Sequence, residues 1–161
     1  MTRILVVALS GGGNAHHDNE VSQRETWANS PFADISVVWL KGDSRALELD
    51  SYSNLRLPMP EVYSNLLSKT VEAFRWATSN VEFDFAIRTN TSTYLNLPLL
   101  RDHVRLLSDR EVFEGVVGLW RHSNYRRGAW VPYCSGSCML LSVDAVSVLS
   151  NVVPDSWDGI P

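Results

Sequence analysis

M-T-R-I-L-V-V-A-L-S-G-G-G, at residues 1–13, opens the chain with six consecutive apolar residues that are followed by a serine and three glycines. The apolar run is too short to span a membrane, and no signal-peptide cleavage pattern follows it. A short apolar run that ends at glycines instead predicts a buried strand over residues 3–9. We therefore expect a cytoplasmic protein with no integral membrane segment.

Strand and helix patterns alternate along the rest of the chain. Apolar runs and two-residue alternation predict further strands at residues 34–40, 82–88, 114–120 and 138–142. Helices are predicted at residues 20–29, 44–49, 61–79, 97–107 and 144–150. Loops are expected at residues 10–19 and, as a loop or hairpin, 121–132. Strands that alternate with helices indicate an α/β domain, in which helices flank a mainly parallel central sheet.

Length and composition fit one ordinary globular domain. The chain has 161 residues, of which 45% are hydrophobic and 20% charged, and these values exclude disordered, collagenous and coiled-coil classes. A net charge of -4 argues against nucleic acid as a partner. Cys134 and Cys138 have no further Cys or His nearby in the sequence. We expect them to be reduced thiols rather than zinc ligands.

Three loops are candidate ligand sites, at residues 10–19, at residues 89–92 and near Cys134, because parallel sheets bind ligands at the carboxyl ends of their strands. The glycine-rich segment after the first predicted strand precedes a helix and can cradle a phosphate, although it matches neither the Rossmann fingerprint nor the P-loop. A mobile loop is the alternative interpretation. The polar run T-N-T-S at residues 89–92 is either part of a ligand site or a turn that caps the next helix.

Four blocks of sequence, taken in order, carry a resemblance to a known family. They are R-E-T-W at 24–27, E-V-Y-S-N-L-L-S-K-T at 61–70, F-D-F-A-I-R-T-N-T-S-T-Y-L-N at 83–96 and V-P-Y-C-S-G-S-C-M-L-L-S-V-D at 131–144. With these blocks the chain resembles the beta-1,3-galactosyltransferase and Fringe group of glycosyltransferases. The resemblance implies a single GT-A domain over residues 1–161, a Rossmann-like nucleotide-sugar-binding fold. It is either a minimal transferase or a fragment truncated at its C-terminus.

The resemblance also implies an activity. An inverting hexosyltransferase of this kind moves a sugar from a nucleotide-sugar donor, a UDP-sugar by analogy, to the hydroxyl of a glycan or another acceptor. A non-catalytic module that binds sugars or nucleotide sugars is the alternative. The residues expected on the donor side are Ser10, Gly11, Arg24, Lys69, Arg88, Thr89, Asn90, Thr91 and Ser92.

One departure from the family concerns the metal. Asn90, Thr91 and Ser92 stand where the family has three aspartates that bind a divalent cation. Neutral side chains are poor ligands for Mg²⁺ or Mn²⁺, so no metal is expected at this motif. Metal-independent transfer, a metal held elsewhere and loss of catalysis remain open. Transfer without metal needs fixed positive charge near the phosphates, for which Arg24, Lys69 and Arg88 are candidates. The alternatives without a role in the site are a solvated helix face for Lys69 and a strand-end salt bridge for Arg88.

The family's catalytic carboxylate follows the fourth block. P-D-S-W-D-G occupies residues 154–159, where Asp155 matches by following a proline and Asp158 by preceding a glycine. Either could act as the general base, and a solvated loop is the alternative. The residues expected on the sugar or acceptor side are Tyr133, Cys134, Ser135 and Gly136, with Trp130 and Trp157 to stack on a sugar ring. Gly136 would let the backbone approach a ligand closely.

Overall fold

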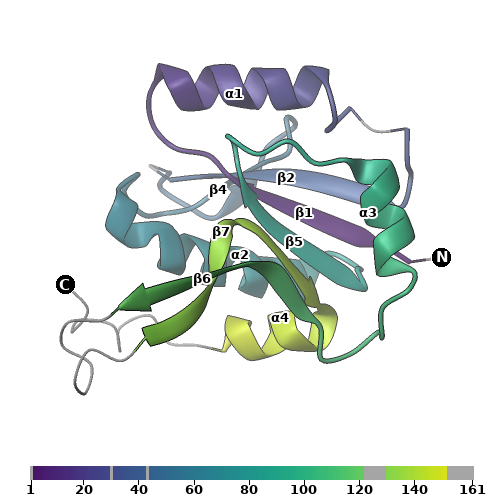
Figure 1. The fold of residues 1–161 in the computed structure, drawn as a ribbon. Helices are drawn as coiled ribbons and strands as arrows, with labels where there is room; N and C mark the ends of the chain where they lie inside the picture. Colours follow the sequence, from purple (N-terminus) through teal and green to yellow (C-terminus); the bar gives the residue numbers. More distant parts are fainter. Residues whose placement is uncertain (1, 30, 43, 122–129, 152–161) are drawn as a thin grey trace.

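The computed structural model describes residues 2–29, 31–42, 44–121 and 130–151, which form one seven-stranded sheet with helices on both faces (Figure 1). The strands are β1 (Ile4–Leu9), β2 (Ile35–Lys41), β3 (Glu48–Leu49), β4 (Asn54–Arg56), β5 (Phe85–Asn90), β6 (Phe113–Arg121) and β7 (Trp130–Ser142). The helices are α1 (Asn14–Glu25), the 3-10 turn η1 (Tyr63–Asn65), α2 (Leu66–Asn80), α3 (Leu97–Val104) and α4 (Val143–Ser150). None of these helices is long and apolar enough to cross a membrane.

The sheet has a parallel centre and antiparallel edges. Its strand order is β3-β4-β2-β1-β5-β7-β6. The pairs β4/β2, β2/β1 and β1/β5 are parallel, whereas β3/β4, β5/β7 and β7/β6 are antiparallel. The prediction of a mainly parallel sheet is therefore correct only for the centre. β6 and β7 are separated by eight residues, 122–129, too few for the crossover that a parallel pair requires.

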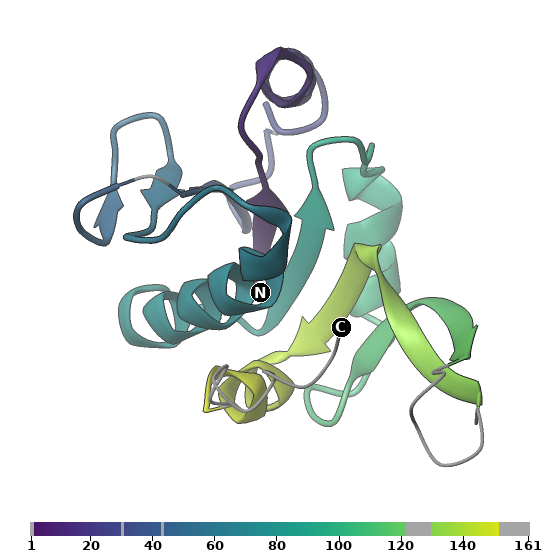
Figure 2. The same cartoon turned by 90° about the vertical axis from the view of Figure 1, so that its left-hand side faces the viewer.

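Each face of the sheet carries its own hydrophobic cluster. Leu5, Val7 and Leu9 of β1 point to the face that α2 and α4 cover, where these helices lie side by side (Figure 2). Ile4 and Val6 point to the opposite face, which α3 and the chain after α1 cover. Because β1 is buried on both faces, its sequence is continuously apolar rather than alternating. The strand predicted from the opening stretch is confirmed.

Several predicted boundaries are wrong. α1 begins at Asn14 instead of residue 20, directly after Gly13, whose φ of 97° brings the chain sharply into the helix. Residues 44–49 form no helix, because Glu48 and Leu49 pair with β4. β7 begins at Trp130, so the region expected to be a substrate-side loop lies within a strand.

The apolar spacing of the helix after β5 predicts Leu99, Leu100, Val104 and Leu107 as its buried side, and this prediction is partly wrong. Leu99 is 66% exposed, whereas Leu97 and Val104, seven residues apart, face the core. Asn96 accepts a hydrogen bond from the backbone N–H of Leu99 and caps the helix, which places Leu97 at its first turn. The position of the Asn96 cap, and not the number of apolar residues in the helix, therefore sets which leucines are buried.

Candidate functional site

The strand order reverses between β1 and β5, and a cavity of about 320 Å³ lies at that point. From β1 the chain passes through α1 to β2 on one side, while β5 lies on the other side of β1. Ligands bind to such sheets at the carboxyl ends of the strands where this reversal occurs. The polar and glycine residues that line this switch-point cavity are Ser10, Gly11, Gly12, His16, Glu61, Tyr63, Arg88 and Asn90. The structure thus brings together four of the predicted donor-side residues, Ser10, Gly11, Arg88 and Asn90.

Arg88 supplies a buried positive charge at the cavity. It lies on β5 with 8% of its surface exposed, and its guanidinium donates a hydrogen bond to the carbonyl of Gly136. Burial lowers the pKa of Arg88, and Cys134 and Tyr63 only partly oppose that shift. No carboxylate pairs with Arg88 among the residues that the structure describes. The strand-end salt bridge is therefore not found there, and the charge faces the cavity without a counterion.

Gly136 is required by Arg88 rather than by a ligand. A β-carbon at position 136 would collide with the Arg88 guanidinium. The close approach of a ligand to this glycine stays a prediction, and in the described structure the group that lies against Gly136 is the Arg88 guanidinium. Gly136 and Arg88 form one unit in which β7 fixes the guanidinium beside the cavity.

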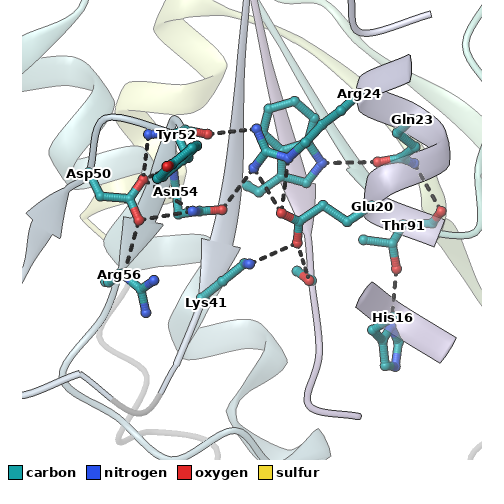
Figure 3. A network of polar contacts seen from close by, with 12 residues as sticks. His16, Glu20, Gln23, Arg24, Lys41, Asp50, Tyr52, Asn54, Arg56 and Thr91 are labelled. Atoms are coloured by element: carbon teal, nitrogen blue, oxygen red, sulfur yellow. Dashed lines mark hydrogen bonds and ion pairs between the residues drawn. The ribbon is translucent and has the colours of Figure 1, made fainter. Parts of the chain in front are cut away.

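His16, from the first turn of α1, contributes an imidazole to the same cavity. Its Nδ1 lies 3.0 Å from the hydroxyl oxygen of Thr91 (Figure 3). A β-carbon at Gly11 would lie 2.6 Å from Cδ2 of the His16 ring, so the ring packs against bare backbone. Gly11, the first of the three glycines, thus leaves the space that the His16 ring occupies.

Gln23 holds the loop after β5, and the sequence carried no signal for this role. Its side-chain Nε2 lies 3.1, 3.0 and 2.9 Å from the carbonyl oxygens of Asn90, Thr91 and Thr93. Its Oε1 accepts a hydrogen bond of 3.1 Å from the indole of Trp39. Because Gln23 is buried on α1, it locks the start of the loop to the helix (Figure 3).

Glu20 organises the polar contacts between α1, β1 and β2. It accepts hydrogen bonds from Ser10 and Arg24 and pairs with Lys41 at 2.9 Å. Burial alone would raise the pKa of Glu20, but the hydrogen bonds from Lys41 and Arg24 outweigh it and lower the pKa. The hydroxyl of Ser10 is thereby directed at Glu20 and away from a ligand.

Arg24 lies in this network and does not line the switch-point cavity. Its guanidinium stacks 3.6 Å from the ring centre of Trp39 and donates a hydrogen bond of 2.9 Å to Asn54 (Figure 3). The network continues to Asp50. Burial would raise the pKa of Asp50, but hydrogen bonds from Asn54, Tyr52 and Arg56 lower it to about 2. Arg24 therefore packs α1 on the sheet, and its donor-side role stays a prediction.

Lys69 is fully buried, which excludes the solvated helix face. Its ammonium donates a hydrogen bond of 2.9 Å to the carbonyl of Ser10 and pairs with Glu61. The other Glu61 oxygen accepts a hydrogen bond of 2.5 Å from the backbone N–H of Gly42. Because Glu61 neutralises the charge, Lys69 acts on the cavity by holding residue 10 rather than by offering a free cation.

Asn90, Thr91 and Ser92, which the resemblance aligns with a metal motif, do not offer the ligands that a divalent cation needs. Asn90 Oδ1 already accepts hydrogen bonds of 3.1 Å from Ser92 and 2.6 Å from Thr93. Thr91 is 3% exposed and engages His16. Hard dications require several free, preferably charged, oxygen ligands. Within the described ranges no group of three His, Cys, Asp or Glu residues is placed to hold a metal.

The other predicted residues have varied positions. Thr89 is fully buried and its hydroxyl donates a hydrogen bond of 2.7 Å to the carbonyl of Ser137, so it joins β5 to β7. Cys134 and Cys138 are free thiols, and burial raises the pKa of both. Ser135 lies 3.1 Å from Ser137, oxygen to oxygen. Trp130 and Tyr133 belong to β7, with side chains outside the described part, and Asp155, Trp157 and Asp158 lie outside the described residues.

No protein-family model matches this chain. It is similar to UDP-GalNAc:beta-1,3-N-acetylgalactosaminyltransferase 2 of Danio rerio, with 24% identity over 149 residues. The match covers 84% of this chain and 30% of the relative, so the chain spans about a third of that protein's length. The similarity supports a distant relationship to beta-1,3-glycosyltransferases.

Proposed function

We propose that the chain is the donor-binding domain of a GT-A glycosyltransferase, which moves a hexose from a UDP-sugar to a hydroxyl acceptor. The observation that carries the proposal is the buried guanidinium of Arg88 at the switch-point cavity, which pairs with no carboxylate of residues 2–29, 31–42, 44–121 and 130–151 that the structure describes. A protein keeps such a charge out of water at a cost, and an anionic ligand would supply the missing partner. The relative from Danio rerio supports a nucleotide sugar as that ligand, since its name includes UDP-GalNAc.

The cavity can receive a diphosphate without metal. Arg88 is the fixed positive charge, and Gly12 presents bare backbone to the cavity, whereas the His16 ring packs on Gly11. Oriented donors of this kind stabilise the charge that develops on a departing nucleoside diphosphate. A non-catalytic binder is the second candidate, favoured by the neutral residues Asn90, Thr91 and Ser92. Turnover with an acceptor distinguishes the two.

Transfer with inversion is a single displacement. The acceptor oxygen forms a bond to the anomeric carbon as the bond from that carbon to the diphosphate oxygen breaks. The proton of the acceptor hydroxyl goes to a carboxylate, for which we propose Asp155, with Asp158 as the alternative. The diphosphate leaves with its electron pair, toward Arg88.

Donor binding is expected to be independent of divalent metal. Titration calorimetry with UDP and a panel of UDP-sugars should give the same affinity in Mn²⁺ and in EDTA, because neutral residues replace the acidic motif. The same panel serves to identify the sugar. Absence of binding to every nucleotide would overturn the donor assignment, whereas binding only in Mn²⁺ would overturn the metal-free mechanism alone.

Asp155→Asn is expected to lower kcat by about a hundredfold with little change in donor affinity, because a general base acts in the displacement and not in binding. Steady-state kinetics and calorimetry on the same preparation measure both quantities. Asp158→Asn is the matched control, since it removes the same charge three residues away. If Asp158→Asn alone lowers kcat, that residue is the base.

A further inference from the structure

We infer that His16 is a phosphate-binding residue of the donor site and that Thr91 positions it. The inference rests on the proposed function and goes further, because it names a second side chain besides Arg88 that can donate a hydrogen bond to a phosphate. His16 lines the switch-point cavity together with Arg88, so the two side chains can reach one ligand.

Two contacts fix the imidazole. The Thr91 hydroxyl lies 3.0 Å from Nδ1, and Gly11 offers bare backbone on which the ring lies. Thr91 is itself immobile, because it is 3% exposed, its backbone N–H donates to Leu9 and its carbonyl accepts from Gln23. A residue held by β1 and by α1 thus determines the orientation of the ring.

This arrangement leaves Nε2 as the functional nitrogen. When the Thr91 hydroxyl donates to Nδ1, the neutral imidazole carries its proton on Nε2 and is a hydrogen-bond donor there. A protonated ring would donate from Nε2 as well and would add a positive charge. In both of these forms His16 offers a hydrogen-bond donor to a phosphate oxygen in the cavity that Arg88 also lines.

The neutral residue at position 91 links the expected loss of a metal site to the position of His16. Thr91 is the middle one of the three residues that replace the family's acidic motif. Its hydroxyl contacts His16 instead of coordinating a cation. One substitution therefore removes a carboxylate from the site and supplies the partner that holds an imidazole, so that a histidine contributes to the neutralisation that metal would otherwise provide.

The test compares UDP with uridine, because the two share a nucleoside and differ in phosphates. Titration calorimetry on His16→Phe should show UDP binding about tenfold or more weaker, the value of a hydrogen bond to a charged group, with uridine binding unchanged. Phenylalanine keeps the ring that packs on Gly11. His16→Gln, which restores a side-chain N–H, should recover most of the UDP affinity. Thr91→Val should weaken UDP binding several-fold, also without effect on uridine.

His103→Gln is the control, because it changes a half-exposed histidine on α3 that pairs with Glu114 away from the cavity. It should leave both affinities unchanged. Unaltered UDP binding by His16→Phe would overturn the inference, as would a parallel loss of UDP and uridine binding, which indicates a structural role. Wild-type protein that binds neither compound would instead overturn the proposed function, so the two failures are distinguishable.

Discussion

Arg88→Met should reduce kcat/KM for the UDP-sugar by about a thousandfold while leaving the protein folded, because truncation of a buried, ligand-paired charge costs about 2–5 kcal/mol of binding energy. Arg88 is the one arginine that lines the switch-point cavity, at 8% exposure. Methionine has a similar length but can neither donate a hydrogen bond nor carry charge. Calorimetry measures the loss of UDP affinity, and steady-state kinetics measure the loss of kcat/KM.

The stability of this variant is as informative as its activity. Loss of Arg88 leaves the Gly136 carbonyl without its guanidinium donor, which costs about 1–3 kcal/mol. The same change removes a desolvated charge that has no carboxylate partner in the described part of the chain, and burial of a single ion costs several kcal/mol. The two effects offset, so urea denaturation should give nearly the wild-type free energy of unfolding.

Arg101→Met is the matched control, because we expect this variant to lose stability and to keep its UDP affinity. Arg101 lies 4.4 Å from the ring centre of Phe32 and donates a hydrogen bond of 2.9 Å to the buried carboxylate of Asp34. Its loss should lower stability and leave UDP affinity unchanged below the unfolding transition. An Arg88→Met protein with wild-type UDP affinity, or one destabilised as much as Arg101→Met, would contradict a ligand-binding role for Arg88.

Periodicity predicted the elements whose burial follows from local pattern. β1 is continuously apolar because it is central, and α2 repeats its apolar residues at helical spacing. The start of α1 was missed because the polar sequence N-A-H-H-D-N resembles a loop, and only its position after Gly13 makes it a helix. The length of β7 was missed because glycine and serine are poor strand formers, and pairing with β5 and β6 overrides that preference.

The site was predictable in place but not in detail. The rule that ligands bind where strand order reverses pointed to the residues after β1 and β5, which the structure brings together. It could not separate Arg88 from Arg24, since the two are alike in residue type and differ in whether a carboxylate lies beside them. Gln23 is equally invisible in sequence, because its value depends on three carbonyl groups about seventy residues away.

Lys69→Met is the largest expected loss of stability in the described part of the chain. The change removes a fully buried ammonium and takes the Lys69 charge away from Glu61, whose side chain is 13% exposed. Breaking a buried pair in this way typically costs about 3–5 kcal/mol, and partial solvation of Glu61 places the expectation near 3 kcal/mol. At about 2–4 °C per kcal/mol for a domain of this size, calorimetry should record a Tm lower by roughly 6–12 °C.

Lys41→Met is the matched control, because Lys41 is the other lysine of the chain and pairs with a carboxylate that keeps further partners. Since Arg24 and Ser10 still contact Glu20 in that variant, its Tm should change by less than half as much. Lys69→Met combined with Glu61→Gln should lose less stability than the sum of the single variants, because the double change leaves no unpaired charge of this pair. Additive losses, or a Tm for Lys69→Met equal to that of Lys41→Met, would show that the pair does not stabilise the wall of the cavity. A coupled loss would support Lys69 and Glu61 as the pair that holds residue 10 through the Ser10 carbonyl, while Arg88 lines the cavity as the charge proposed to meet the ligand.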